Sequence, residues 1–381
     1  MDTPESELLK QIIQDYSVGE ITHYEILPLG YVNTSYAVTT STDNGVHKYL
    51  LRLYRAGVEE AGVIFEHSII KHLERKGFDL TARVLPTNSG LTYICRRVDP
   101  YDDYAVQFYA LFEYLSGEDK FSWIKPECSD GEIAEAAKVL ARFHDGVSDL
   151  IPSGQRSEPA IIDLLPLIGE AIKARLQKNS GSSFYKELLA YQDFILCAIQ
   201  NVHRAIDSTE FRQTLHLVNH GDYHPGNLKF DGGKVVGLFD LDWSKVDART
   251  FDLGVALTYF CASWDMSRIE NYFRLDRAVT FLSAYQTELT QIGGVSLLDA
   301  IELKFLPEMV AAGNIYIMEW ALRDYYERAD DPPEYLSYLQ HHLCLMHWFE
   351  DQSNRRQLDQ MIQETLAPLG IVHTERRDSG S

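Results

Sequence analysis

One short stretch of this 381-residue chain combines side chains that could carry out phosphoryl transfer. It reads HGDYHPGN over residues 220–227, and an apolar run over 235–239 then leads to Asp240. A carboxylate such as Asp222 can orient and deprotonate an attacking hydroxyl, while the oxygens of Asn227 and Asp240 suit a Mg²⁺ ion held against a triphosphate. The types and spacing of these residues therefore indicate Mg²⁺-dependent phosphoryl transfer.

Three other interpretations of the same stretch remain open. Asp, Asn, Gly and His are turn formers, so the residues could form a solvated loop, although apolar residues flank them on both sides. His220 and His224 have a spacing that suits two zinc ligands on a helix, but the glycines and the proline around them disfavour a helix. A hydrolase that binds two metal ions could use Asp222, Asp240 and Asp242, but it leaves the N-terminal part of the chain unexplained.

The N-terminal part of the chain predicts a small antiparallel β-sheet with one helix. Short β-prone runs occupy residues 24–29, 35–40, 47–54, 91–98 and 106–115. Asn44-Gly45 between the second and third runs is a hairpin signal, because a tight turn needs the positive φ angles that these residues adopt readily. Apolar residues at helical spacing over Glu59 to Lys76 predict a helix that ends at Gly77.

A polar break at residues 116–119 separates this sheet from a mainly helical remainder. Helices are predicted over 129–147, 161–178 and 184–206 and in several segments after residue 252. Among them, two apolar runs at 227–230 and 234–241 flank an Asp-Gly-Gly turn and predict an embedded hairpin. We therefore expect an α+β fold with two domains, residues 1–115 and residues 116–381.

Composition excludes several classes of function. The chain has 35 basic and 56 acidic residues and a formal charge of −21, so most of its surface repels a phosphate-rich partner such as nucleic acid. Its five cysteines are widely spaced and form no Cys-x-x-Cys motif, which fits a reducing compartment better than a disulfide framework. No segment approaches the roughly 18 apolar residues that span a bilayer, and Met1 to Asp15 contains no apolar h-region, so we expect no secretory signal. We expect a cytoplasmic protein without a membrane partner, and the sequence does not define its oligomeric state.

The stretch around Asp222 resembles the signature of a known superfamily. The His-Gly-Asp-x-x-x-x-Asn pattern, the hairpin, Asp240 after it and Thr-Phe-Asp-Leu at 250–253 are similar to the aminoglycoside phosphotransferase, choline kinase and homoserine kinase superfamily. The resemblance implies a bilobal protein kinase-like fold, with ATP and Mg²⁺ as cofactors and a small-molecule hydroxyl as acceptor. It also implies that Asp222 is the catalytic base, that Asn227 and Asp240 bind Mg²⁺, and that Asp252 braces the catalytic loop.

The same resemblance assigns nucleotide-binding residues in the N-terminal lobe. They are Gly30, Asn33, Thr34 and Ser35 in the loop between the first two strands, Arg52 and Glu66, and Glu113 and Leu115 in the hinge. Arg52 lies in the third strand, where the superfamily has a basic residue at the phosphates, and Glu66 on the following helix is placed to pair with it. Because an Arg fork does not replace a Lys point charge freely, the pairing with Glu66 is the firmer expectation.

The resemblance places the acceptor on the helical lobe, facing Asp222. The candidate contacts are Asp242, Trp243, Trp264, Asp265, Tyr316, Glu319, Trp320 and Arg323. An amine such as choline or an aminoglycoside suits the acidic chain. A hydroxy amino acid such as homoserine instead needs a cation for its carboxylate, which Arg323 or Arg249 could supply, and a sugar is a further alternative.

Two other functions also remain open. A Ser/Thr protein kinase of the same superfamily needs an open peptide groove, whereas the long helical segments between 161 and 206 favour a closed pocket. An inactive kinase-like binding or scaffold protein gains nothing from Asp222, Asn227 and Asp240 together. His144 is expected to support the loop rather than to act in catalysis.

Overall fold

The computed structural model describes residues 4–27, 33–97, 106–122, 127–178, 180–264, 273–328 and 333–366. The chain divides into two units. The first unit comprises Met1–Glu118, Asp149–Ser157 and Val236–Asp242, and the second comprises Asp119–Ser148, Glu158–Val235 and Trp243–Ser381. The division at residue 115 stays a prediction, and the chain returns to the first unit twice after Glu118.

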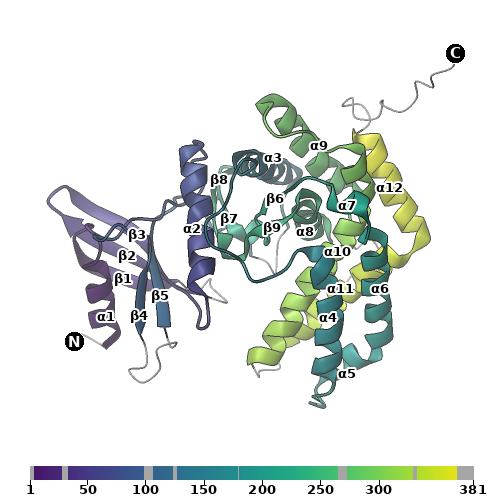
Figure 1. Cartoon of the computed structure of the whole chain (residues 1–381), viewed down its shortest axis with the longest axis horizontal. Coiled ribbons are helices and arrows are strands. Elements are labelled where there is room, and N and C mark those ends of the chain that lie inside the picture. Colours follow the sequence, from purple (N-terminus) through teal and green to yellow (C-terminus); the bar gives the residue numbers. More distant parts are fainter. Residues whose placement is uncertain are drawn as a thin grey trace. The chain divides into compact units, whose positions relative to one another are not determined.

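The first unit is built on a five-stranded antiparallel sheet with the strand order β1-β2-β3-β5-β4 (Figure 1). Its elements are α1 (Pro4–Ile13), β1 (Glu20–Leu27), β2 (Thr34–Thr42), β3 (Gly45–Leu53), α2 (Glu60–Arg75), β4 (Ile94–Arg97) and β5 (Val106–Glu113). The predicted hairpin joins β2 to β3, with Thr42 opposite Gly45. The predicted helix is α2, and it ends before Gly77, whose φ of 76° suits a glycine.

Helix α1 covers the core of this sheet. Leu9 and Ile12 of α1 are buried against Val38 of β2, Leu51 of β3 and Leu111 of β5. Alternate residues of a strand point to the same face, so the sheet offers α1 a continuous apolar surface. This packing against the sheet stabilises α1.

The second unit is mainly helical. Its helices are α3 (Asp130–Gly146), α4 (Ile161–Leu176), α5 (Ser183–Ala190), α6 (Gln192–Ile206), α7 (Thr209–Arg212), α8 (Arg249–Cys261), α9 (Leu275–Ile292), α10 (Ala300–Arg328), α11 (Pro333–Glu350) and α12 (Gln352–Leu366). One helix predicted over 184–206 is in fact two, because Tyr191 leaves helical geometry with φ −103° and ψ 6°. The α+β class that the sequence predicted is confirmed.

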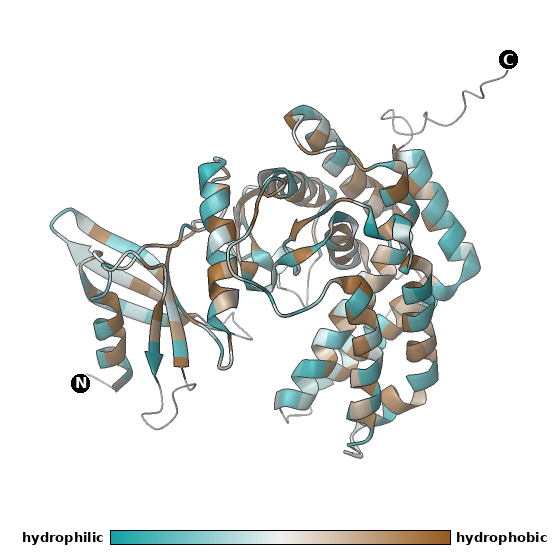
Figure 2. Ribbon diagram, in the orientation of Figure 1, coloured by the Kyte–Doolittle hydropathy of each residue, from teal (hydrophilic) through white to brown (hydrophobic). Residues whose placement is uncertain are grey.

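Helix α8 forms the centre of the second unit. All of its residues are buried, and it packs against α10 at two glycines. A Cβ atom on Gly254 would lie 2.1 Å from the Met309 carbonyl oxygen, and one on Gly313 would lie 2.7 Å from Gly254. The two helix backbones therefore approach so closely that only glycine fits. In contrast, α12 is mostly hydrophilic (Figure 2) and lies at the edge of this core.

Short strands surround the loop that carries the candidate catalytic residues. β6 (His216–Asn219) pairs antiparallel with β9 (Lys245–Ala248), and β7 (Leu228–Asp231) pairs with β8 (Lys234–Leu238). The predicted hairpin is β7 and β8, but β8 ends three residues before the expected position, because Asp240 has a φ of 70° and turns the chain. The strands β6 and β9 were not predicted from the sequence. None of the helices in the described ranges combines the length and hydrophobicity needed to span a bilayer.

Candidate active site

The loop at residues 220–227 is held in the second unit by one buried carboxylate. Asp252 accepts hydrogen bonds from the backbone N–H groups of His220 (2.7 Å) and Gly221 (3.0 Å), and from Nε2 of His144 (3.0 Å). Burial alone would raise the pKa of Asp252, but these partners outweigh burial and hold the pKa below its ordinary value. The expected brace is therefore present, and His144 acts through it.

Gly221 is the position where the loop touches the chain that follows the hairpin. Its φ is +82°, and a Cβ atom there would lie 2.4 Å from the carbonyl oxygen of Trp243. The Ser244 hydroxyl also donates a hydrogen bond to the His220 carbonyl oxygen at 3.2 Å. Both the backbone conformation and the contact require glycine, which fixes the backbone on the N-terminal side of Asp222.

Asp222 and Asn227 are brought together within the loop. The Asn227 Nδ2 group donates to the Asp222 carbonyl oxygen at 2.8 Å and to its carboxylate at 3.2 Å. The amide nitrogen thus faces Asp222, and within the described chain the Asn227 Oδ1 atom accepts no hydrogen bond. An amide oxygen left in this way is a suitable ligand for a hard cation such as Mg²⁺.

The carboxylate of Asp222 has a histidine beside it. The Gly226 N–H donates to Nδ1 of His224, so Nε2 carries the proton and faces the Asp222 carboxylate at 3.4 Å. Burial would raise the pKa of Asp222, but His224, His220 and the Asn227 amide outweigh burial and lower it. The carboxylate is therefore ionised at neutral pH, and its side chain is 26% exposed.

Zinc binding by His220 and His224 finds no support here. The Nδ1 atom of each ring already accepts a backbone N–H, from Asp222 and Gly226 respectively. In addition, the described residues hold no group of three or more His, Cys, Asp or Glu side chains arranged to bind a metal ion. The role of His224 beside Asp222 was missed by sequence reasoning, although a histidine two residues after the aspartate was visible.

In the first unit, a buried guanidinium bridges two carboxylates. Nη1 of Arg52 on β3 lies 3.0 Å from Glu66 on α2, and Nη2 lies 3.0 Å from Asp240. The Tyr54 hydroxyl donates to the other oxygen of Glu66 at 2.7 Å. The pairing of Arg52 with Glu66 was predicted, whereas the link to Asp240 crosses 188 positions of sequence and was not.

The charges of this cluster are not balanced by Arg52 alone. Burial would lower the pKa of Arg52, but Asp240, Glu66 and Asp242 outweigh it and raise that pKa. For Glu66 burial dominates, and its pKa rises to about 7 despite Arg52. Asp240 is also the only non-glycine among the described residues with a positive φ, a conformation that is often found at functional sites. Carboxylates that outnumber the guanidinium they share suit a divalent cation.

Asn33 and Asp242 form a second long-range contact in the same unit. The Asn33 Nδ2 group donates to Oδ2 of Asp242 at 2.7 Å, while its Oδ1 accepts the Arg55 N–H at 3.0 Å. The other oxygen of Asp242, Oδ1, is buried without a hydrogen-bond partner in the described structure. A buried carboxylate oxygen of this kind calls for a ligand, which is consistent with a cation site beside Asp240.

The remaining nucleotide candidates lie on strands, just after a strand or outside the described residues. Thr34 and Ser35 are the first residues of β2, and Gly30 falls outside the described ranges. The Glu113 N–H donates to the Arg83 carbonyl oxygen at 2.9 Å. Of its backbone groups, Glu113 can therefore offer only the carbonyl to a ligand, and Leu115 follows the end of the strand.

The acceptor candidates in the second unit lie on α10 and just after the hairpin. The rings of Trp243 and Trp320 are 3.7 Å apart at 84°. Arg323 stacks on Trp320, and Glu319 pairs with Arg175 of α4. Asp265 lies outside the described residues.

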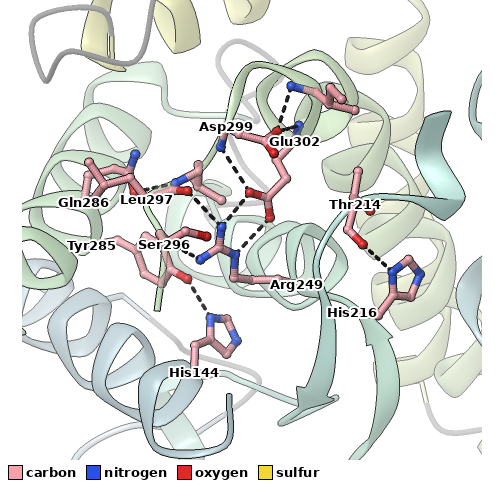
Figure 3. A network of polar contacts seen from close by, with 12 residues as sticks. His144, Thr214, His216, Arg249, Tyr285, Gln286, Ser296, Leu297, Asp299 and Glu302 are labelled. Atoms are coloured by element: carbon pink, nitrogen blue, oxygen red, sulfur yellow. Dashed lines mark hydrogen bonds and ion pairs between the residues drawn. The ribbon is translucent and has the colours of Figure 1, made fainter. Parts of the chain in front are cut away.

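Arg249 is not available to a substrate, contrary to the alternative raised from the sequence. It is fully buried, and it donates to Glu302 at 2.9 Å and to the carbonyl oxygens of Ser296 (2.6 Å) and Leu297 (3.3 Å). Figure 3 shows the guanidinium directed at these three groups, with Tyr285 and His144 beside them. Arg249 ties the start of α8 to the loop before α10, which is a structural role.

The chain is similar to known phosphotransferases and kinases in sequence. Residues 23–285 match a family described as "Phosphotransferase enzyme family". A homoserine kinase from Chelativorans sp. (strain BNC1) is 24% identical over 352 residues, which cover 88% of this chain and 93% of that protein.

Solved structures agree on the fold. An aminoglycoside phosphotransferase from Alicyclobacillus acidocaldarius superposes with a TM-score of 0.57 at 14% identity, covering 94% of this chain and 96% of the other. An amicoumacin kinase in complex with AMP-PNP and Ca²⁺ gives a TM-score of 0.59 at 15% identity, covering 98% and 96%. The fold is thus the protein kinase-like fold that the sequence motifs implied.

Proposed function

This chain belongs to the phosphotransferase enzyme family, and we propose that it transfers the γ-phosphoryl group of ATP, with Mg²⁺, to a hydroxyl group of a small molecule. That it is a phosphotransferase with an alcohol group as acceptor follows from the family. The observation that supports the detailed reaction is the loop of Asp222. Its backbone is fixed by the buried Asp252, and its Asn227 amide leaves an oxygen available.

In this proposal Asp222 is the catalytic base. Its depressed pKa keeps the carboxylate ionised, so that it can accept a hydrogen bond from the attacking hydroxyl. Phosphoryl transfer has a loose transition state in which positioning contributes more than basicity, so a weak but fixed base is sufficient. The Nε2–H group of His224 restricts the orientation of that carboxylate.

Asn227 and Asp240 are the proposed Mg²⁺ ligands, and the bound ion would neutralise charge that develops on the phosphates. Arg52 uses Nη1 and Nη2 on Glu66 and Asp240, so we infer that it positions Asp240 as well as adding positive charge for the nucleotide phosphates. The other proposed nucleotide contacts are Gly30, Asn33, Thr34, Ser35, Glu113 and Leu115. The proposed acceptor contacts are Asp242, Trp243, Asp265, Glu319, Trp320 and Arg323.

A small acceptor is favoured over a protein substrate. The homoserine kinase from Chelativorans matches 88% of this chain, and the neighbouring structures are named as kinases of aminoglycosides and of ethanolamine. We therefore propose an acceptor of this size, with homoserine among the first to be tested. The inactive-scaffold alternative is disfavoured because Asp222, Asn227 and Asp240 are all retained. A cytoplasmic location belongs to the same proposal, since all five cysteines are free thiols.

The test is an ADP-release assay with Mg-ATP and a panel of hydroxylated amines, amino acids, sugars and aminoglycosides. Asp222→Asn should lower kcat by about 10²- to 10⁴-fold, because it removes the proton acceptor. ATP affinity, measured by calorimetry, should stay close to that of the wild type. Asp231→Asn is the matched control, since Asp231 is exposed at the hairpin turn. Wild-type turnover in Asp222→Asn would overturn the assignment, and ATP binding without turnover on any acceptor would favour the scaffold alternative.

A further inference from the structure

Arg323 is a cation in the second unit that is held by aromatic rings. Its Cζ atom lies 3.7 Å from the ring centre of Trp320 and 5.5 Å from that of Trp243. A guanidinium that stacks on an indole keeps its N–H groups in the plane of the fork, where they can bind a planar anion with two hydrogen bonds. The position of Arg323 is therefore fixed without use of its donors.

The acid expected to neutralise Arg323 is engaged elsewhere. Glu319 lies one helical turn before Arg323, a spacing and orientation that favour an ion pair along the helix. However, both oxygens of Glu319 accept hydrogen bonds from Arg175 of α4, at 2.6 and 2.7 Å. Within the described chain, Arg323 has no hydrogen bond or ion pair with any carboxylate. A half-buried cation in this state can take an anionic ligand at little desolvation cost.

Arg323 is connected to the catalytic loop through Trp243. The carbonyl oxygen of Trp243 is the atom that excludes a Cβ from Gly221, next to Asp222, and its ring packs against Trp320. Tyr316 gives a second connection. Its pKa is raised by burial first and then by carboxylates that include Asp222, so Asp222 lies within electrostatic reach of α10. Tyr316, Trp320 and Arg323 follow one another at a spacing of four and three residues along that helix, so they lie on one face of it.

The other buried cations and the aromatic rings of this unit are less suited to bind an acceptor than Arg323. Arg249 is buried against Glu302, and Lys245 is buried and lies 3.1 Å from Glu158. A quaternary ammonium needs free aromatic faces, but Arg323 already covers Trp320, and Trp264 is stacked at 4.0 Å on His341. The aromatic faces that could hold such an amine thus have other partners.

We propose that Arg323 determines acceptor specificity by binding a carboxylate of the substrate, so that the acceptor is a hydroxy acid, with or without an amino group. This inference rests on the proposed function and narrows it. Aminoglycosides, choline and ethanolamine lack a carboxylate and are excluded as the preferred class. Arg323 acts on binding and orientation, and it makes no contact with the transferred group.

Three acceptors separate the contributions of the two charged groups. Homoserine carries both a carboxylate and an amine, 4-hydroxybutanoate carries only the carboxylate, and 3-aminopropan-1-ol carries only the amine. With Arg323→Gln, kcat/KM for the two carboxylates should fall by about tenfold to a hundredfold, mainly through KM, because a charged hydrogen-bonded pair is lost. The value for 3-aminopropan-1-ol should stay the same. Arg323→Lys should restore part of the loss, since it keeps the charge without the fork.

A second variant tests whether Arg323 binds the carboxylate by changing the partner of Glu319. Arg175→Gln releases Glu319, which can then pair with Arg323 and compete with the substrate carboxylate. KM for homoserine should rise severalfold in Arg175→Gln, whereas KM for 3-aminopropan-1-ol, which has no carboxylate to be displaced, should not rise. Lys304→Gln is the matched control, because it removes one exposed positive charge from the same helix far from Arg323.

The outcomes distinguish this inference from the proposed function. Binding of 4-hydroxybutanoate can be followed by tryptophan fluorescence through Trp243 and Trp320, without any turnover. Carboxylate binding that depends on Arg323, but without ADP release, would sustain the inference and refute the proposed function. If the best acceptor lacks a carboxylate, if Arg323→Gln lowers activity equally for all three acceptors, or if no carboxylate binds, the inference is wrong.

Discussion

The brace of the catalytic loop gives the sharpest quantitative prediction, for Asp252→Asn. The substitution keeps the shape of the side chain and replaces one carboxylate oxygen by an NH₂ group. Oδ2 of Asp252 accepts two hydrogen bonds, from His220 and His144, and Oδ1 accepts one, from Gly221. The side chain of the Asp252→Asn variant would therefore lose the fewest hydrogen bonds if its NH₂ group took the place of Oδ1, because only the Gly221 N–H would then lack an acceptor.

The free energy of unfolding should then fall by about 2–4 kcal/mol. The Gly221 N–H is left buried and opposite another donor, which costs about 1–3 kcal/mol. The two remaining hydrogen bonds become neutral instead of charge-assisted, and their weakening by roughly half adds about 1 kcal/mol. Because the loop would shift near Asp222, kcat should fall by about 10²-fold, the effect of a displacement of about 1 Å.

Urea unfolding followed by tryptophan fluorescence measures the first effect, since Trp243, Trp264 and Trp320 lie in the same unit as Asp252. Asp276→Asn is the control, because that carboxylate is 63% exposed and its loss should change stability by no more than about 0.5 kcal/mol. A loss below about 1 kcal/mol for Asp252→Asn would show that the brace carries little energy. If the free energy of unfolding falls by the full expected amount while kcat is unchanged, the brace does not position Asp222.

Two further predictions concern Glu66 and Gly221. The pKa of Glu66 is raised from 4.5 to about 7 in the folded chain, so the native state binds the proton more tightly and its stability falls as pH rises from about 4.5 to 7. Relative to Glu66→Gln, the free energy of unfolding of the wild type should fall by up to about 3 kcal/mol between these pH values. Urea titrations at pH 5 and pH 8 measure the difference in this free energy between wild type and Glu66→Gln. The same difference at both pH values would refute the prediction. Gly221→Ala should destabilise by about 2–4 kcal/mol, from a left-handed φ and a clash with the Trp243 carbonyl oxygen. Gly233→Ala has a similar φ of +84° but meets no atom within 4 Å, so equal losses in calorimetry would show that the clash contributes nothing.

Elements with local signals could be predicted from the sequence. The β2–β3 hairpin follows from Asn44-Gly45 between two β-prone runs, and α2 follows from its apolar period and the terminal Gly77. The pairing of Arg52 with Glu66 could be predicted as well, because a strand and the next helix along the chain are usually neighbours in space.

Contacts between distant parts of the chain could not be predicted in this way. Asp240 meets Arg52 across 188 residues and Asp242 meets Asn33 across 209, and no local pattern encodes either approach. The strands β6 and β9 are four residues each, too short for their alternation to stand out. The break at Tyr191 carries no glycine or proline, so the apolar period continues through it.

The net charge illustrates how a global property can mislead about a site. A charge of −21 favours a cationic acceptor, yet charges separated by more than a Debye length of about 8–10 Å are largely screened, so the partners within that distance decide. The buried cations Arg52, Lys245 and Arg249 each have a carboxylate in contact. Arg323 is half-buried and differs from these three cations, because within the described residues no carboxylate forms an ion pair with it. That local difference, rather than the total charge, is the basis on which we infer a negatively charged ligand group.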